Sequence, residues 1–133
     1  MESARLFALA QEAAKASYSP YSKFRVGAAL LCSDGSVFTG ANVENRSFGL
    51  TICAERSALV AAVSAGKRDF VGIAIATPDA DYPVSPCGAC RQVLSEFLKP
   101  EAPIVFGSSP AKLVEATVGQ LLPSDALHEL ADR

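Results

Sequence analysis

Two short cysteine motifs, well separated in the sequence, constrain the fold of this chain more than any other feature. They are Cys53-Ala54-Glu55 and Pro86-Cys87-Gly88-Ala89-Cys90. Each begins where the spacing of apolar residues predicts a helix, over about 52–65 and about 87–98. The free N–H groups and the positive end of the dipole at a helix N-terminus stabilise a thiolate, the form of cysteine that binds metal ions. The spacing therefore predicts two helices that meet at their N-termini and present three cysteines to one ion.

Glu55 gives this predicted metal site a catalytic character. It follows Cys53 by two residues, which places it beside the metal but on another side of the helix. Three protein ligands leave one tetrahedral position of a zinc ion open for water, whereas structural zinc sites are usually closed by four. A carboxylate in this place can take a proton from the activated water and pass it on. The order Cys-x-Glu, then Pro-Cys-x-x-Cys, matches the three-cysteine variant of the zinc deaminase signature.

Other interpretations of the cysteines stay open at this stage. A Cys-x-x-Cys pair also occurs in redox sites, and all three cysteines could be ordinary core residues, although neither interpretation accounts for Glu55. A structural zinc site would need a fourth ligand, for which Cys32 and His128 are the candidates. Cys32 lies in an apolar run and is expected in the core. His128, the only histidine, lies near the polar C-terminus and is expected in solvent.

An arginine directly follows each of the two motifs. A zinc ion with three thiolates has a net negative charge, which would weaken it as a Lewis acid. Arg56 follows Glu55 and Arg91 follows Cys90. A guanidinium near the sulfur atoms would offset part of that charge. Both arginines could instead be ordinary surface charges.

The chain as a whole alternates helical segments with short apolar strands. We expect a helix over 3–16, strands over 25–32 and 37–41 joined by a turn, a loop over 42–49, a helix over 52–65, a strand over 71–76, a helix over 87–98, a strand over 104–106, a further strand over 112–117 and a helical turn over 118–122. Small residues nearly all round the helix at 52–65 predict that it is closely packed on every side. This order predicts a single α/β domain over residues 1–133 with helices on both faces of a sheet and parallel, right-handed crossovers.

Composition and charge exclude several classes of function. Twelve basic and 14 acidic residues give a formal net charge of −2, with no basic run, so the features of a nucleic-acid binder or a basic membrane-surface helix are missing. No uncharged apolar stretch approaches the roughly 18 residues of a membrane-spanning helix. Charged residues interrupt the N-terminus, so we expect no signal peptide and a cytoplasmic location, where cysteines remain reduced. Half of the residues are hydrophobic, enough for a full core and for contacts between subunits.

The chain resembles the small cytidine deaminases that act on free nucleosides. The resemblance extends from Tyr18 to about Leu127 and rests on four segments in order: Tyr18–Ala29, Gly40–Asn45, Cys53–Arg56 and Ser85–Val93. It implies a three-layer α-β-α fold around a five-stranded mixed sheet. It also implies hydrolysis of cytidine and 2′-deoxycytidine to the uracil nucleosides and ammonia, in pyrimidine salvage, by a homotetramer with active sites at subunit interfaces.

The resemblance assigns the chemistry to four residues. Cys53, Cys87 and Cys90 would hold one zinc ion per subunit. The water activated there would attack C4 of the pyrimidine while Glu55 shuttles protons.

The resemblance also assigns the substrate contacts. Phe24 would lie against the base, and the backbone of Ala54 would contact it. Asn42 and Glu44 would bind the ribose 3′-hydroxyl, since an amide offers a donor and an acceptor and a carboxylate offers acceptors. The segment Arg46–Phe48 would reach the active site of a neighbouring subunit.

The sequence departs from the family pattern at two places and leaves two other functions open. Phe48 stands where tyrosine is common, so a hydroxyl contact to the sugar 5′ end is lost. After Leu121-Leu122-Pro123 only Leu127 stands near the position where the family usually has a phenylalanine. The alternatives are a deaminase of another aminopyrimidine nucleoside, such as a nucleoside antibiotic, and a non-enzymatic zinc module. The segment Asn42-Val43-Glu44 favours an ordinary ribose, and Glu55 favours an enzyme.

Overall fold

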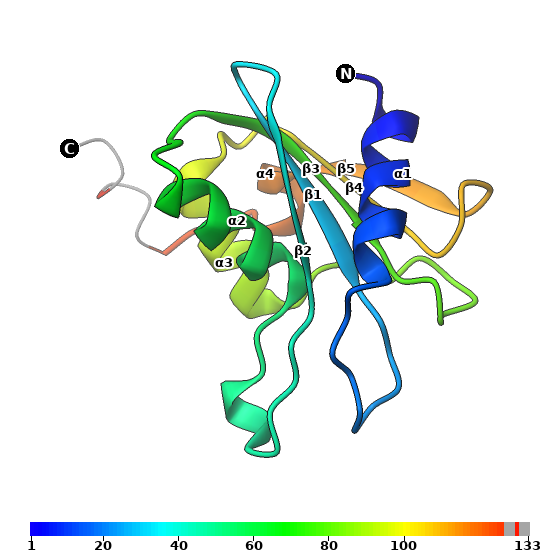
Figure 1. Ribbon diagram of the computed structural model, residues 1–133. Helices are drawn as coiled ribbons and strands as arrows, with labels where there is room; N and C mark the ends of the chain where they lie inside the picture. Colours follow the sequence, from blue (N-terminus) through cyan, green and yellow to red (C-terminus); the bar gives the residue numbers. More distant parts are fainter. Residues whose placement is uncertain (127–129, 131–133) are drawn as a thin grey trace.

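A five-stranded mixed sheet with helices on both faces forms the body of the protein, as a computed structural model shows (Figure 1). The structure describes residues 1–126 and 130, so Leu127 and His128 lie outside the described residues. The strands, in the sheet order β2-β1-β3-β4-β5, are β1 (Gly27–Cys32), β2 (Val37–Ala41), β3 (Phe70–Ala76), β4 (Pro103–Gly107) and β5 (Leu113–Thr117). The helices are α1 (Ser3–Ala14), α2 (Ala54–Ser64), α3 (Gly88–Phe97) and α4 (Val118–Leu121), with a 3₁₀ turn η1 (Phe48–Leu50).

The pairing of the strands confirms the predicted fold class. Strand β1 is antiparallel to both of its neighbours, β2 and β3, so these two neighbours run parallel to each other. Strand β3 is parallel to β4, and β5 is antiparallel to β4. The connections through α2 and through α3 therefore join parallel strands, as expected, while their handedness stays a prediction.

The helices divide the core into two parts, one on each face of the sheet. On one face α1 packs with Leu6, Phe7 and Ala10 against the inward residues of β1, β3 and β4. On the other face α2 and α3 bury a larger cluster that includes Leu30, Ile73 and Ile75. Alternate residues of a strand point to opposite faces, and helices cover both faces, so the central strands β1, β3 and β4 are buried at nearly every position. Figure 1 shows α1 on one side of the sheet and α2 with α3 on the other.

Gly40 sets the position of α2, the helix that begins at the first cysteine motif. A Cβ atom at this residue of β2 would lie 2.4 Å from the backbone nitrogen of Ala58 and 2.8 Å from the carbonyl oxygen of Ala54. No side chain fits in that space, so glycine allows the backbone of α2 to rest directly on the strand. The N-terminus of α2 is thereby fixed against the sheet.

Two expectations about this helix are wrong. It begins at Ala54 and not near Ile52, because the backbone of Ile52 exchanges two 2.9 Å hydrogen bonds with Val43 and belongs to a β-bridge. The expectation that the helix is packed on every side also fails within one chain. Ala58 and Ala62 are buried, but Val60 is 56% exposed, since a helix that lies on a sheet buries only the side turned to it.

Strand β2 has the predicted range, and each of the other predicted helices and strands agrees with its predicted range to within two residues. Helix α1 ends at Ala14 and strand β1 begins at Gly27. The segments 15–26 and 42–53 extend from the same end of the sheet and are joined by a parallel bridge between Tyr18 and Val43 (Figure 1). Among residues 1–126 and 130, no helix combines the length and the hydrophobicity that crossing a membrane requires.

Candidate active site

Three cysteine sulfurs converge where the N-termini of α2 and α3 meet. Cys53 is the N-cap of α2, Cys87 is the N-cap of α3, and Cys90 lies in the first turn of α3. Their Sγ atoms all lie within 4.8 Å of one another. Neither N-cap cysteine uses its side chain to cap its helix, so both sulfurs are available as ligands. This is the juxtaposition of helix N-termini that the spacing of the motifs predicts.

The surroundings favour a thiolate at Cys53, which suits a metal cation, whereas the close approach of Cys53 and burial raise the pKa of the Cys90 thiol. The close approach of Cys90 lowers the pKa of the Cys53 thiol to about 5, and the Arg56 guanidinium adds to this effect against the opposing effect of burial. The Nη2 atom of Arg56 lies 3.5 Å from Cys53 Sγ and donates to the Thr51 carbonyl at 3.3 Å. The buried Nε of Arg56 has no hydrogen-bond partner among the described residues. Three soft thiolate donors with a cation beside them fit a zinc ion.

Arg91 lies in a different environment from Arg56. Its Nε donates to the Pro86 carbonyl at 2.7 Å, its Nη1 to the Leu121 carbonyl at 2.9 Å and its Nη2 to the Ser85 hydroxyl at 2.9 Å. These hydrogen bonds link the segment before Cys87 to the end of α4. The described contacts therefore give Arg91 a supporting role for the cysteine loop, and they include no hydrogen bond from Arg91 to a sulfur atom.

Glu55 is a buried carboxyl group beside the cysteines. Only 4% of its surface is exposed. Burial, which disfavours the charged form, raises the pKa of this carboxyl, and the nearby Cys53 acts in the same direction. Glu55 lines a cavity of about 200 Å³ together with Cys53, Cys87 and Ala54. A protonatable group with a raised pKa in such a cavity is typical of a general acid–base residue.

Phe24 and Asn42 line the same cavity from the two segments that extend beyond the sheet. The Asn42 side chain is 7% exposed, and its Oδ1 accepts hydrogen bonds from the Val26 amide at 2.9 Å and from the Ser17 hydroxyl. Its Nδ2 donates to the Phe24 carbonyl at 2.8 Å. Both acceptor positions of Oδ1 are therefore used, and one N–H of Nδ2 remains for a ligand.

Glu44 lines a second hollow of about 390 Å³, which shares Thr51 with this cavity, and it is held by residues of the segment 15–26. Its Oε1 accepts from the Tyr21 amide at 3.0 Å and from the Ser22 amide at 3.2 Å, and its Oε2 accepts from the Ser22 hydroxyl. The Ser22 hydroxyl is the main reason why the pKa of Glu44 lies below its ordinary value. The carboxylate is ionised at neutral pH and keeps acceptor capacity on Oε2.

The segment Arg46–Phe48 does not line the cysteine cavity of its own chain. Phe48 is 74% exposed, packs near Tyr21 at 5.9 Å between ring centroids, and lines a neighbouring hollow with Glu44 and Thr51. Neither Arg46 nor Phe48 lines the cavity that contains the cysteines.

Sequence analysis missed several residues that shape the site. Thr51 and Ser85 also line the cavity. Arg25 binds the Asp79 carboxylate through its backbone amide at 2.8 Å and through its guanidinium at 3.0 and 2.7 Å, which ties the loop after β3 to the start of β1. The available signals were two segments of the family resemblance: Ser85–Val93 begins with Ser85, and Tyr18–Ala29 contains Arg25 but does not reveal its partner.

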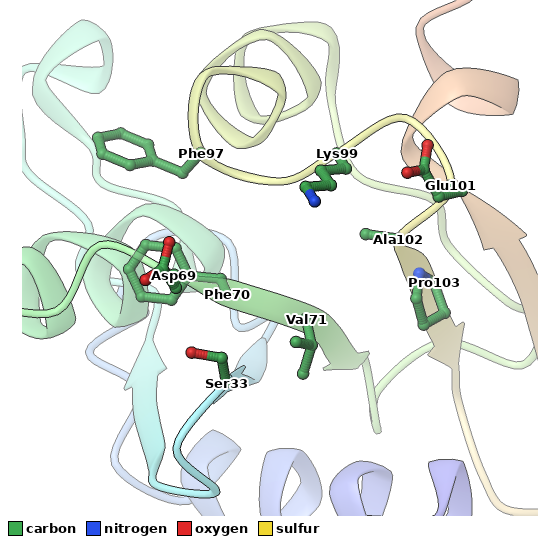
Figure 2. A pocket seen from close by; sticks show the side chains of 9 residues that line it. All are labelled: Ser33, Asp69, Phe70, Val71, Phe97, Lys99, Glu101, Ala102 and Pro103. Carbon is green, nitrogen blue, oxygen red and sulfur yellow. The ribbon is translucent and has the colours of Figure 1, made fainter.

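A larger hollow of about 540 Å³ lies at the other end of β3 (Figure 2). Phe70, Phe97 and Pro103 supply its apolar lining, while its charged residues, Asp69, Lys99 and Glu101, are exposed. It contains no cysteine and no buried titratable group. The cysteine cavity, which combines a possible metal site with a buried carboxyl group, is therefore the candidate active site.

The site and the fold together define a class before any comparison is made. A carboxylate two residues after one of three cysteine ligands, with the other two in Pro-Cys-x-x-Cys, is typical of zinc-dependent deaminases. The family model of the cytidine and deoxycytidylate deaminase zinc-binding region matches residues 1–106. The chain therefore belongs to the cytidine and deoxycytidylate deaminase family, whose zinc the three cysteines are suited to hold.

Individual relatives agree with this assignment over most of the chain. The chain is 50% identical over 123 residues to a cytidine deaminase of Halalkalibacterium halodurans, covering 92% of each protein. It is 46% identical over 123 residues to a cytidine deaminase of Sporosarcina psychrophila, covering 92% of this chain and 90% of the relative. The crystal structure of cytidine deaminase from Burkholderia pseudomallei superposes with a TM-score of 0.88 at 45% identity, covering 92% of this chain and 98% of the other.

Proposed function

We propose that this protein catalyses the hydrolytic deamination of cytidine and 2′-deoxycytidine to the uracil nucleosides and ammonia, in pyrimidine salvage. The observation that carries the proposal is the buried Glu55 carboxyl beside three converging cysteines, in a cavity lined by an aromatic ring and an amide. The similarity to proteins named cytidine deaminase favours cytidine over other aminopyrimidine nucleosides.

The chemical step depends on Glu55 and on the three cysteines. Cys53, Cys87 and Cys90 hold zinc, which when bound supplies the Lewis acidity that makes water a nucleophile near neutral pH. Glu55 accepts the proton that the water loses and delivers protons to the pyrimidine and to the departing amino group. Its raised pKa suits this role, because the group must hold a proton between steps.

The substrate lies between the two segments that line the cavity. Phe24 offers an apolar ring for the flat base, and the backbone of Ala54 lies beside the cysteines where the reacting end of the base would be. Asn42 has one free N–H to donate, and Glu44 has a free acceptor position on Oε2. A single hydroxyl group that accepts from Asn42 and donates to Glu44 satisfies both, and the ribose 3′-hydroxyl is that group.

We also propose that the active site is completed by a neighbouring subunit in a homotetramer. The cavity of about 200 Å³ in one chain is smaller than the roughly 300–1,000 Å³ of typical ligand sites. Phe48 is 74% exposed and Val60 is 56% exposed, which leaves apolar surface for subunit contacts. The segment Arg46–Phe48 then reaches the site of the next subunit. The 133 residues act as one domain, and the four free thiols fit the cytoplasm.

The test of the proposed activity is ammonia release from cytidine, compared with other 4-aminopyrimidine nucleosides, together with zinc analysis. Glu55→Gln keeps the shape of the side chain but cannot accept a proton, so the rate should fall by about 10²–10⁴-fold with zinc still near one per chain. Glu96→Gln, an exposed glutamate on α3, is the matched control and should leave the rate unchanged. Normal turnover by zinc-loaded Glu55→Gln would refute the role of Glu55, and no ammonia from cytidine would refute the proposed function.

Subunit mixing tests the shared site. Glu55→Gln and Phe48→Ala subunits, each poorly active alone, should recover activity when they form hybrids. Some sites in a hybrid contain Glu55 from one subunit and Phe48 from its neighbour. A fully active monomer in sedimentation would contradict the proposal.

A further inference from the structure

The Ser22 hydroxyl joins two groups that the proposed function uses separately. It donates a hydrogen bond to Oε2 of Glu44, and it accepts a hydrogen bond from the backbone amide of Phe24 at 3.0 Å. Glu44 is the carboxylate for the sugar and Phe24 is the ring for the base. One hydroxyl group therefore links the sugar contact to the base contact.

The turn that carries this hydroxyl is strained and needs to be held. Lys23 lies between Ser22 and Phe24 with φ at 59°, the only non-glycine residue in the left-handed region among those described. A side chain in this region is disfavoured and persists only where surrounding contacts impose it. The contacts here are the hydrogen bond from Phe24 to Ser22 across Lys23, the three hydrogen bonds that Glu44 accepts from Tyr21 and Ser22, and a 3.0 Å hydrogen bond from the Lys23 amide to the Ser19 carbonyl.

The backbone of Phe24 is held on its other side as well. Its carbonyl accepts a hydrogen bond from Nδ2 of Asn42 at 2.8 Å. The amide of Phe24 thus depends on Glu44 through Ser22, and the carbonyl depends directly on Asn42. Both side chains assigned to the sugar also fix the residue assigned to the base.

We propose that Ser22 is a positioning residue that couples recognition of the sugar 3′-hydroxyl to placement of the Phe24 ring over the base. The inference rests on the proposed function of the same site. Without the hydroxyl, Glu44 loses the partner on Oε2 that orients it, and the Phe24 amide loses its acceptor. A bound sugar hydroxyl then no longer reinforces the turn that carries the ring.

The experiment compares Ser22→Ala with wild type on two substrates, cytidine and 2′,3′-dideoxycytidine, which lacks the 3′-hydroxyl. Loss of one hydrogen bond to a charged group should lower kcat/KM for cytidine by about tenfold. The fall for the dideoxy substrate should be clearly smaller, because Glu44 has no hydroxyl to bind there. Ser22→Thr keeps the hydroxyl and should recover the wild-type preference. Zinc content should stay near one per chain in all variants.

A double-mutant cycle with Glu44→Ala tests whether Ser22 acts through the carboxylate. If Ser22 and Glu44 are coupled, the fold-loss in kcat/KM for cytidine in the double variant Ser22→Ala/Glu44→Ala should be smaller than the product of the fold-losses in the two single variants. Ser36→Ala is the matched control, since the Ser36 hydroxyl also donates to a carboxylate, that of Asp34 at 2.6 Å, but in the remote β1–β2 turn. Ser36→Ala should leave kcat/KM unchanged for both substrates.

The outcomes separate the inference from the proposed function. The coupling is refuted, and the proposed function stands, if wild-type protein deaminates cytidine and Ser22→Ala has the same kcat/KM. The same conclusion follows if Ser22→Ala lowers kcat/KM for both substrates by the same factor and the losses in the double-mutant cycle multiply. If wild-type protein releases no ammonia from cytidine, the proposed function fails and the inference falls with it.

Discussion

Asn42 should matter for stability as well as for substrate binding, and the structure gives the size of the effect. The side chain is 7% exposed and makes three hydrogen bonds. Asn42→Ala leaves the Val26 N–H and the Phe24 carbonyl without their partners. Each unsatisfied buried polar group costs about 1–3 kcal/mol, so the free energy of unfolding should fall by about 2–6 kcal/mol. The Ser17 hydroxyl adds little, because it keeps the Ser19 hydroxyl as a partner at 3.0 Å.

This loss is large against the roughly 5–15 kcal/mol by which domains are usually stable. It should be measured by urea unfolding of zinc-loaded protein at fixed zinc and protein concentrations, because metal and subunit binding shift the transition. The midpoint should fall with little change in slope. The same variant should raise KM for cytidine, since Phe24 loses the contact that holds its carbonyl.

The matched control is Asn45→Ala, in the same loop. Asn45 is exposed, and its Oδ1 accepts one hydrogen bond, from the Ser47 amide at 2.9 Å. Its loss should cost less than about 1 kcal/mol, because water replaces the lost partner. If Asn42→Ala destabilises the protein no more than Asn45→Ala does, the argument from unsatisfied buried groups is wrong.

Three further predictions concern the metal site and the loop after β3. Cys53→Ser should lose zinc, measured by metal analysis, whereas Cys32→Ser should keep zinc and activity and lose about 1–3 kcal/mol of stability from burying a hydroxyl. Arg56→Gln should raise the pKa of Cys53, although Cys90 would still stabilise the Cys53 thiolate. When the protein is dialysed against chelator over a pH series, the variant should therefore lose zinc at a higher pH than wild type. Identical zinc-retention curves would place Arg56 outside the electrostatics of the site. Hydrogen bonds from Arg25 hold the pKa of Asp79 below its unfolded value, so this pair stabilises the protein above about pH 4 and its contribution disappears as pH falls through the folded pKa. The free energies of unfolding of wild type and Asp79→Asn should therefore differ at neutral pH and converge in acid. A difference that stays constant with pH would contradict this account.

The sequence by itself determined the chemistry of the site and the class of the fold. Cys87 and Cys90 lie on one helical turn, and Glu55 lies two residues from Cys53, so their relation to a metal follows from local geometry. Apolar periodicity located the helices and strands to within one or two residues in most cases, because alternation and helical spacing are also local. The resemblance to a family then implied a five-stranded mixed sheet and a nucleoside substrate, whereas the order of the strands came from the structure.

Only the tertiary structure decided the partners that lie far apart in the sequence. Arg91 follows Cys90, which suggested charge compensation, yet its guanidinium binds the Leu121 carbonyl 30 residues away. Ile52 has a helical pattern but pairs with Val43, because a β-bridge satisfies its backbone.

The same limit applies to the inner surface of the site. Nothing in the local pattern shows that the Asn42 side chain is held by three residues of the segment 15–26, or that Ser22 stands between Glu44 and Phe24. Hydrogen bonds of this kind depend on distances across the fold, and a residue's neighbours in sequence carry little information about those distances. The sequence therefore names the groups proposed to do the chemistry, and the packing of the segments around β1 decides how those groups are held.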